Sequence, residues 1–137
     1  MNNFEEIYAK KQALKKLFHN IALFGRTCFP TALRKATPPF HHEIYQSLRN
    51  RNKKRVLIAA PRGTAKSTVT SLLLPLHRIA FKHDDDEEFI VIISESQAQS
   101  INFLSRIKYH LTHSQRFKDL FGDMAVSYTH LTLPTKA

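Results

Sequence analysis

The residues best suited to chemistry form one short run near the middle of the chain. Their order is Pro61, Arg62, Gly63, Thr64, Ala65, Lys66, Ser67, Thr68. A loop that joins a buried strand to a helix can turn its backbone N–H groups and the helix N-terminus toward bound phosphates. In such a loop a Lys supplies a point charge and a Ser or Thr hydroxyl ligates Mg²⁺. Lys66 and Ser67 occupy these two places, so the sequence predicts binding of phosphates together with Mg²⁺.

This run departs from the strict phosphate-loop pattern, in which Gly stands six residues and one residue before the Lys. Ala60 and Ala65 occupy those two positions, and Gly63 is the one glycine inside the loop. Alanine fits such a loop wherever its φ is negative, so phosphate binding stays the leading interpretation. The alternative is a plain helix start after a buried strand, with Ser67 or Thr64 as the N-cap residue.

Two apolar runs predict the elements that position this loop. Residues 56–60 and 89–93 are continuous and apolar, which is typical of strands buried on both faces of a sheet. Helical apolar spacing follows each run, over 69–79 and 101–111. The order strand, helix, strand, helix predicts an α/β fold with a parallel sheet of the P-loop NTPase type, flanking helices and a right-handed crossover.

Local signals predict where these helices bend or begin. Pro75 lies inside the first helical pattern, so we expect a kink or an early end near Leu74. Capping-box spacing predicts the start of the second helix at one of two pairs, Ser94 with Gln97 or Ser96 with Gln99.

The N-terminal part contains an amphipathic helical pattern over 4–24, with lysines between the apolar positions. Glycine and prolines over 25–39 predict a connecting segment, and helical spacing resumes over 40–48. No apolar stretch approaches the length of a membrane-spanning helix, so no membrane contact is expected. The single cysteine, Cys28, excludes an internal disulfide and fits a reducing compartment.

Charge is distributed unevenly along the 137 residues, which carry a formal net charge of +10. Through Lys66 there are 14 Lys and Arg against 3 Asp and Glu, whereas from Ser67 onward there are 7 against 8. A positive field of this kind attracts polyanions such as DNA or RNA. A nonenzymatic basic domain that binds nucleic acid is therefore one alternative function, and another P-loop enzyme, such as a kinase or a helicase-like ATPase, is a second.

Three segments together resemble the start of the ATPase domain of tailed-phage terminase large subunits, the motors that package viral DNA. They are Pro-Phe-His-His-Glu-Ile-Tyr at 39–45, the run at 55–68 and Ile-Ile-Ser-Glu-Ser-Gln-Ala-Gln at 92–99. The resemblance covers roughly residues 24–123. Its most specific element is the Arg four residues before the Lys, in the order Arg-Gly-x-x-Lys-Ser.

The resemblance implies a role for each matching residue. Arg62 would sense or stabilise the γ-phosphate, Lys66 would hold the β- and γ-phosphates, and Ser67 would ligate Mg²⁺. His41, with Gln46 nearby, would contact the adenine of ATP. The implied cofactors are ATP and Mg²⁺. The implied partners are double-stranded DNA, the portal, the small terminase subunit and further copies of the intact protein, in the host cytoplasm.

The resemblance also implies an opening fragment of a longer motor. Glu95 follows the second predicted strand, but its neighbours Ser94 and Ser96 favour a helix cap, so we expect no acid that activates water. The last residues, 126–137, resemble translated adapter sequence; the alternative is an ordinary edge strand. We therefore expect three parts: an N-terminal helix with a connecting segment at 1–39, a partial P-loop ATPase domain at 40–125 and a non-native tail at 126–137.

Overall fold

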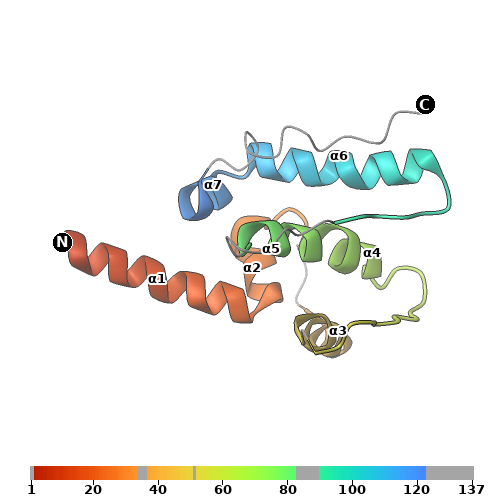
Figure 1. The fold of residues 1–137 in the computed structure, drawn as a ribbon, viewed down its shortest axis with the longest axis horizontal. Helices are drawn as coiled ribbons and strands as arrows, with labels where there is room; N and C mark the ends of the chain where they lie inside the picture. The colour runs from red at the N-terminus through yellow and green to blue at the C-terminus, as the bar shows by residue number, and fades with distance from the viewer. Residues whose placement is uncertain (1, 34–36, 51, 83–89, 123–137) are drawn as a thin grey trace.

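The structure is a computed structural model that describes residues 2–33, 37–50, 52–82 and 90–122. Helices account for 68% of these residues. In chain order they are α1 (Asn3–His19), α2 (Ile21–Cys28), α3 (Pro39–Arg49), α4 (Lys66–Thr68), the short π-helix η1 (Val69–Leu73), α5 (Leu74–Ala80), α6 (Gln97–His113) and α7 (Gln115–Phe121). Figure 1 shows α4, η1 and α5 as one continuous helix in the middle, with α6 on one side and α3 on the other. The first turns of α1 project away from this body.

A helix-breaking residue divides the long N-terminal helix that the apolar spacing predicted over 4–24. Asn20 has φ −137° and ψ 96°, and its side-chain oxygen accepts a hydrogen bond from the N–H of Leu23 at 3.0 Å. Asn is among the strongest N-cap residues, because its short side chain accepts from an N–H that has no partner within the helix. The apolar pattern continues through this point, so the spacing alone did not reveal that α1 ends and α2 begins here.

Pro75 lies within the continuous central helix. It has no N–H, and its ring would collide with the carbonyl of Ser71 in a regular α-helix. The wider π-helix Val69–Leu73 ends two residues before Pro75 and includes Ser71, so the helix is widened where the ring needs room. The disturbance predicted near Leu74 is therefore a local change of helix type, and the helix continues to Ala80.

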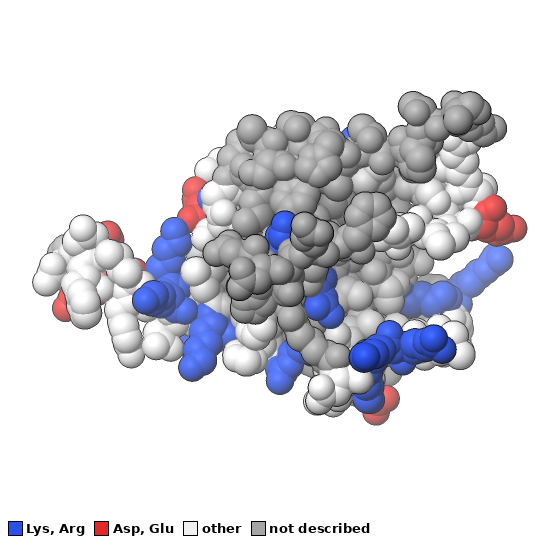
Figure 2. All heavy atoms as spheres, viewed as in Figure 1, with Lys and Arg blue, Asp and Glu red and all other residues white. Residues whose placement is uncertain are grey.

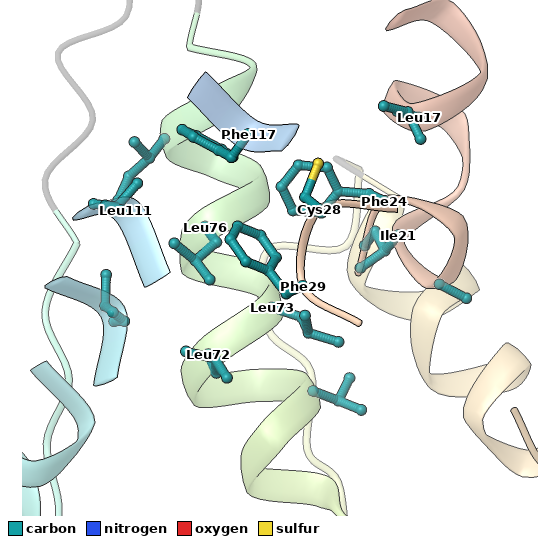
Figure 3. Close-up of a cluster of buried hydrophobic side chains, with 14 of the residues drawn as sticks. Leu17, Ile21, Phe24, Cys28, Phe29, Leu72, Leu73, Leu76, Leu111 and Phe117 are labelled. Carbon is teal, nitrogen blue, oxygen red and sulfur yellow. The ribbon is translucent and has the colours of Figure 1, made fainter. Parts of the chain in front are cut away.

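Aromatic and leucine side chains from several helices fill one core (Figure 3). Its buried members include Leu17, Ile21, Phe24, Cys28, Phe29, Leu72, Leu73, Leu76, Leu111 and Phe117. A Cβ at Gly25 would lie 2.7 Å from Cδ1 of Leu33 and 3.0 Å from Cδ2 of Leu73. The missing side chain at Gly25 thus allows α2 to approach η1 closely.

Polar side chains attach the end of α1 to this core. Nε2 of the buried His77 lies 3.3 Å from the carbonyl oxygen of Leu17 and 3.1 Å from that of Phe18. Arg49 of α3 donates to the carbonyl of His19 at 2.5 Å. The last carbonyls of a helix have no partner within it, so these contacts satisfy groups that would otherwise need water.

The predicted α/β fold with a parallel sheet is wrong for the part of the chain that the structure describes, where no β-strand occurs. Residues 56–60 and 90–93 have no regular hydrogen-bonded structure, and Leu57 and Ile93 are 94% and 89% exposed. A strand requires a neighbour that pairs its N–H and C=O groups. Neither run pairs with another described segment, and the helices supply the buried apolar surface instead.

The described residues on both sides of position 39 share the core, because α2 packs against α5 and α7. The predicted tail at 126–137 and the last three residues of the predicted ATPase part lie outside the described residues. None of the described helices has both the length and the apolar character needed to cross a bilayer.

Candidate functional site

Residues 61–68 form a loop that leads into the first turn of the central helix, and we call them the 61–68 segment. Two of them have left-handed backbone conformations: Gly63 has φ 82° and Ala65 has φ 56°. Glycine accepts this conformation readily, whereas alanine pays about 1–2 kcal/mol because its Cβ crowds the following carbonyl. Alanine was expected to fit such a loop with a negative φ, and the positive φ of Ala65 contradicts that expectation.

The helix begins at Lys66 without a side-chain cap, since Ala65 is the N-cap residue. The expected alternative caps do not form: Thr64 donates its hydroxyl to the carbonyl of Pro61 at 2.7 Å, and Ser67 lies inside the first turn. The first N–H groups of a helix have no acceptor within it, and together with the helix dipole they favour an anion. The helix that starts here continues through η1 and α5 to Ala80.

Lys66 folds back over the loop. Its Nζ donates to the carbonyl oxygen of Ala60 at 2.7 Å and lies 3.5 Å from that of Pro61. The Lys66 side chain therefore joins the first residue of the helix to the carbonyl at the beginning of the loop. A phosphate oxygen is a stronger acceptor for an ammonium group than a neutral carbonyl is, so Lys66 can exchange these contacts for a ligand.

The remaining members of the segment present polar groups at the surface. Arg62 is exposed and makes no side-chain hydrogen bond within the described part of the chain. Ser67 is exposed and Thr68 is half-buried. Figure 2 shows Lys and Arg side chains gathered along the lower edge of the molecule, from α1 toward the region of α3. The segment itself contains two cations, Arg62 and Lys66, and no acidic residue.

The structure brings His41 to the 61–68 segment. This histidine is 5% exposed, and its Nε2 lies 2.6 Å from the carbonyl oxygen of Thr64. Gln46, the other residue expected near adenine, is exposed and lines a different hollow of about 170 Å³ on α3. The remaining lining residues of that hollow are His19, Asn20, Ile21, His42, Tyr45 and Arg49.

Tyr45 is one of the residues that line this hollow. The hydroxyl of Tyr45 is buried and makes no hydrogen bond within the described residues. Burial raises the pKa of Tyr45, and the charge of Arg26 opposes this rise. None of the 61–68 residues lines this hollow.

Magnesium would find one protein ligand in the segment. The Ser67 hydroxyl is exposed beside Lys66 and can supply a single oxygen. Mg²⁺ prefers six oxygen ligands and usually takes most of them from water and phosphate, which fits a site with one hydroxyl. Elsewhere in the described residues, no group of three His, Cys, Asp or Glu side chains is placed to hold a metal ion.

The contact between His41 and Thr64 was not foreseen, although the sequence contained a signal for the burial of His41. His41 shares one helical face with Ile44, Tyr45 and Leu48, at the spacing typical of a core-facing stripe. This spacing places the histidine inward. Its partner 23 residues away follows only from the tertiary arrangement.

Comparisons with protein-family models, curated proteins and solved structures found no match to this chain.

Proposed function

We propose that the 61–68 segment binds the phosphates of ATP together with Mg²⁺. The observation that supports this most strongly is the position of Lys66, whose Nζ contacts the Ala60 carbonyl at 2.7 Å across a loop with two left-handed residues. The ammonium group thus belongs to the first residue of a helix whose N–H groups have no side-chain cap. Both stabilise the negative charge of a phosphate.

Each polar residue has a distinct role in this proposal. Lys66 leaves the Ala60 carbonyl and binds phosphate oxygens. Arg62, at the exposed side of the loop, stabilises charge on the terminal phosphate. Ser67 gives one oxygen to Mg²⁺, which supplies further neutralisation of the phosphate charge when bound.

The wider function we propose is that of a terminase large subunit, in which ATP binding drives the movement of double-stranded DNA. The support is the resemblance of residues 39–45, 55–68 and 92–99, together with the positive field of the N-terminal half. Exposed lysines on α1 and the exposed residues 53–55 offer cations to DNA phosphates. Under this proposal the intact protein works in the host cytoplasm with the portal, the small subunit and further copies of itself.

Nucleotide affinity tests the proposal. A nonhydrolysable ATP analogue with Mg²⁺ is titrated into the wild type, Lys66→Ala and Lys54→Ala. Lys54 is exposed and outside the segment, so its removal changes the net charge equally without touching the site. We expect Lys66→Ala to weaken binding at least about tenfold, the loss typical of a hydrogen bond to a charged group. Equal affinity of the wild type and Lys66→Ala would contradict the proposal.

DNA binding distinguishes this function from that of a nonenzymatic basic domain. The proposed motor binds DNA with an affinity that changes when the ATP analogue and Mg²⁺ are added. Salt-sensitive DNA binding that ignores the nucleotide would favour the nonenzymatic alternative.

A further inference from the structure

His41 has an environment unlike that of the adjacent His42. The side chain of His41 is 5% exposed, whereas His42 is exposed on the same turn of α3. The His41 ring packs edge-on against Phe40, with the centroids 4.6 Å apart, and lies 6.2 Å from the ring of Tyr45. The imidazole is thus held in one orientation by its neighbours.

The direction of its hydrogen bond follows from the partner. Nε2 of His41 lies 2.6 Å from the carbonyl oxygen of Thr64, and a carbonyl oxygen only accepts. Nε2 therefore carries the hydrogen and donates it. This use of Nε2 and the burial of the ring leave little of the side chain to contact a base directly.

Thr64 is the loop residue whose carbonyl oxygen accepts the hydrogen bond from His41. It lies between Gly63 and Ala65, the two residues with positive φ in the 61–68 segment. Two side-chain contacts within the loop also shape it: the Thr64 hydroxyl donates to Pro61, and Lys66 donates to Ala60. Two side chains from other elements also contact the segment: Thr70 of η1 donates to the carbonyl of Lys66 at 2.8 Å, and His41 of α3 donates to that of Thr64.

We propose that His41 is a positioning residue for the phosphate-binding segment. Its hydrogen bond to Thr64 holds the peptide that precedes Ala65, and so keeps Ala65 in the left-handed conformation from which the helix starts. This inference rests on the phosphate-binding function proposed above. His41 contacts the loop and not the ligand, and it acts by keeping the N–H groups of the first turn and the Lys66 ammonium in place before a phosphate arrives.

Amide hydrogen exchange tests the positioning role without any ligand. Exchange is measured by NMR at Val69, whose N–H donates to the carbonyl oxygen of Ala65 at 3.1 Å. The wild type, His41→Ala, His41→Gln and His42→Ala are compared after circular dichroism has confirmed folding. We expect roughly 3- to 10-fold faster exchange in His41→Ala, the effect of losing one ordinary hydrogen bond. His42→Ala should match the wild type. His41→Gln, which keeps an N–H donor at a similar reach, should restore much of the protection.

Nucleotide affinity provides the second readout, with the ATP analogue and Mg²⁺ as the probe. His41→Ala should bind roughly 3- to 10-fold more weakly than the wild type. Ala65→Gly in the His41→Ala background should recover most of this loss, because glycine adopts a positive φ without help. A histidine that touched the base directly would show no such rescue.

The outcomes separate the two proposals. If the wild type binds nucleotide and His41→Ala matches it in both affinity and exchange, the positioning role is wrong and the proposed function stands. If His41→Ala loses affinity and Ala65→Gly restores none of it, the positioning role is also overturned. If neither the wild type nor any variant binds nucleotide, the proposed function fails, and the role of His41 in binding fails with it.

Discussion

Replacing Phe24 by alanine tests the helical core that the structure shows in place of a sheet. Phe24 is 0% exposed on α2, and its ring centroid lies 5.2–6.4 Å from five other rings, those of Phe29, His77, Phe81, Phe117 and Phe121. A buried Phe→Ala change typically costs about 3–5 kcal/mol, from the lost transfer free energy and the cavity left behind. Domains have about 5–15 kcal/mol of total stability, so this is a large fraction of it.

The matched control is the same substitution at Phe4, whose side chain is 75% exposed on α1. Phe4→Ala should change the free energy of unfolding by no more than about 0.5 kcal/mol. Urea unfolding followed by circular dichroism measures both variants, and Phe24→Leu replaces Phe24→Ala if the latter does not fold. Similar costs for Phe24→Ala and Phe4→Ala would refute the packing of α2 against α5 and α7.

Three further predictions concern other parts of the molecule. Burial raises the pKa of Cys28 from 9.0 to about 11, against a smaller opposing effect of Arg116. The unfolded thiol ionises at lower pH than the folded one, so the free energy of unfolding should fall between about pH 9 and 11 by up to about 3 kcal/mol. The fall should be smaller in Cys28→Ala, and equal pH profiles of the wild type and this variant would contradict the prediction. His77→Phe should cost about 1–3 kcal/mol in urea unfolding, because it removes the donor to the carbonyls at the end of α1; an unchanged midpoint would show that this contact contributes nothing. The chain should release phosphate from ATP no faster than Lys66→Ala does, because phosphoryl transfer needs an acid that orients water; sustained turnover that requires both Lys66 and Glu95 would show that Glu95 is that acid.

Local signals predicted helices well where the responsible residues lie close in sequence. Helical spacing over 40–48 corresponds to α3, Pro39–Arg49. Ser96 caps α6 by accepting from the N–H of Gln99 at 3.3 Å, which confirms one of the two predicted capping pairs. Such bonds span three residues, so the sequence nearby contains all the information they need.

The lack of a sheet in the described residues could not be predicted in the same way, because strand pairing depends on segments far apart in the chain. A continuous apolar run is typical of a buried strand, but the run itself does not provide the neighbour that pairs with it. Val56 is 38% exposed and Val91 is 62% exposed, since the buried volume is filled by side chains of α2, η1 and α5. The sequence shows which residues are apolar, but their spacing did not show which of them are buried in the core.

The sequence indicated which residues make up the candidate site, but it did not predict how they are arranged. The order of residues in the 61–68 segment suggested a loop ahead of a helix, and α4 begins at Lys66. The left-handed Ala65 and the bond from His41 to Thr64 depend on contacts between α3 and the loop. The resemblance implied that Gln46 lies near the nucleotide, which stays a prediction; in the structure Gln46 lines a hollow that includes no residue of the 61–68 segment.

Backbone NMR shifts test the central claim, that the 61–68 segment binds the phosphates of ATP, most directly. Spectra of the chain are compared after addition of adenosine and after addition of a nonhydrolysable ATP analogue, each with Mg²⁺. The two ligands share the base and the sugar, so their difference reports the phosphates. We predict that the analogue shifts the amides of residues 62–68 and that adenosine leaves them unchanged. Phosphate-dependent shifts confined to other residues, such as those around the Gln46 hollow, or no shifts at all, would contradict the account.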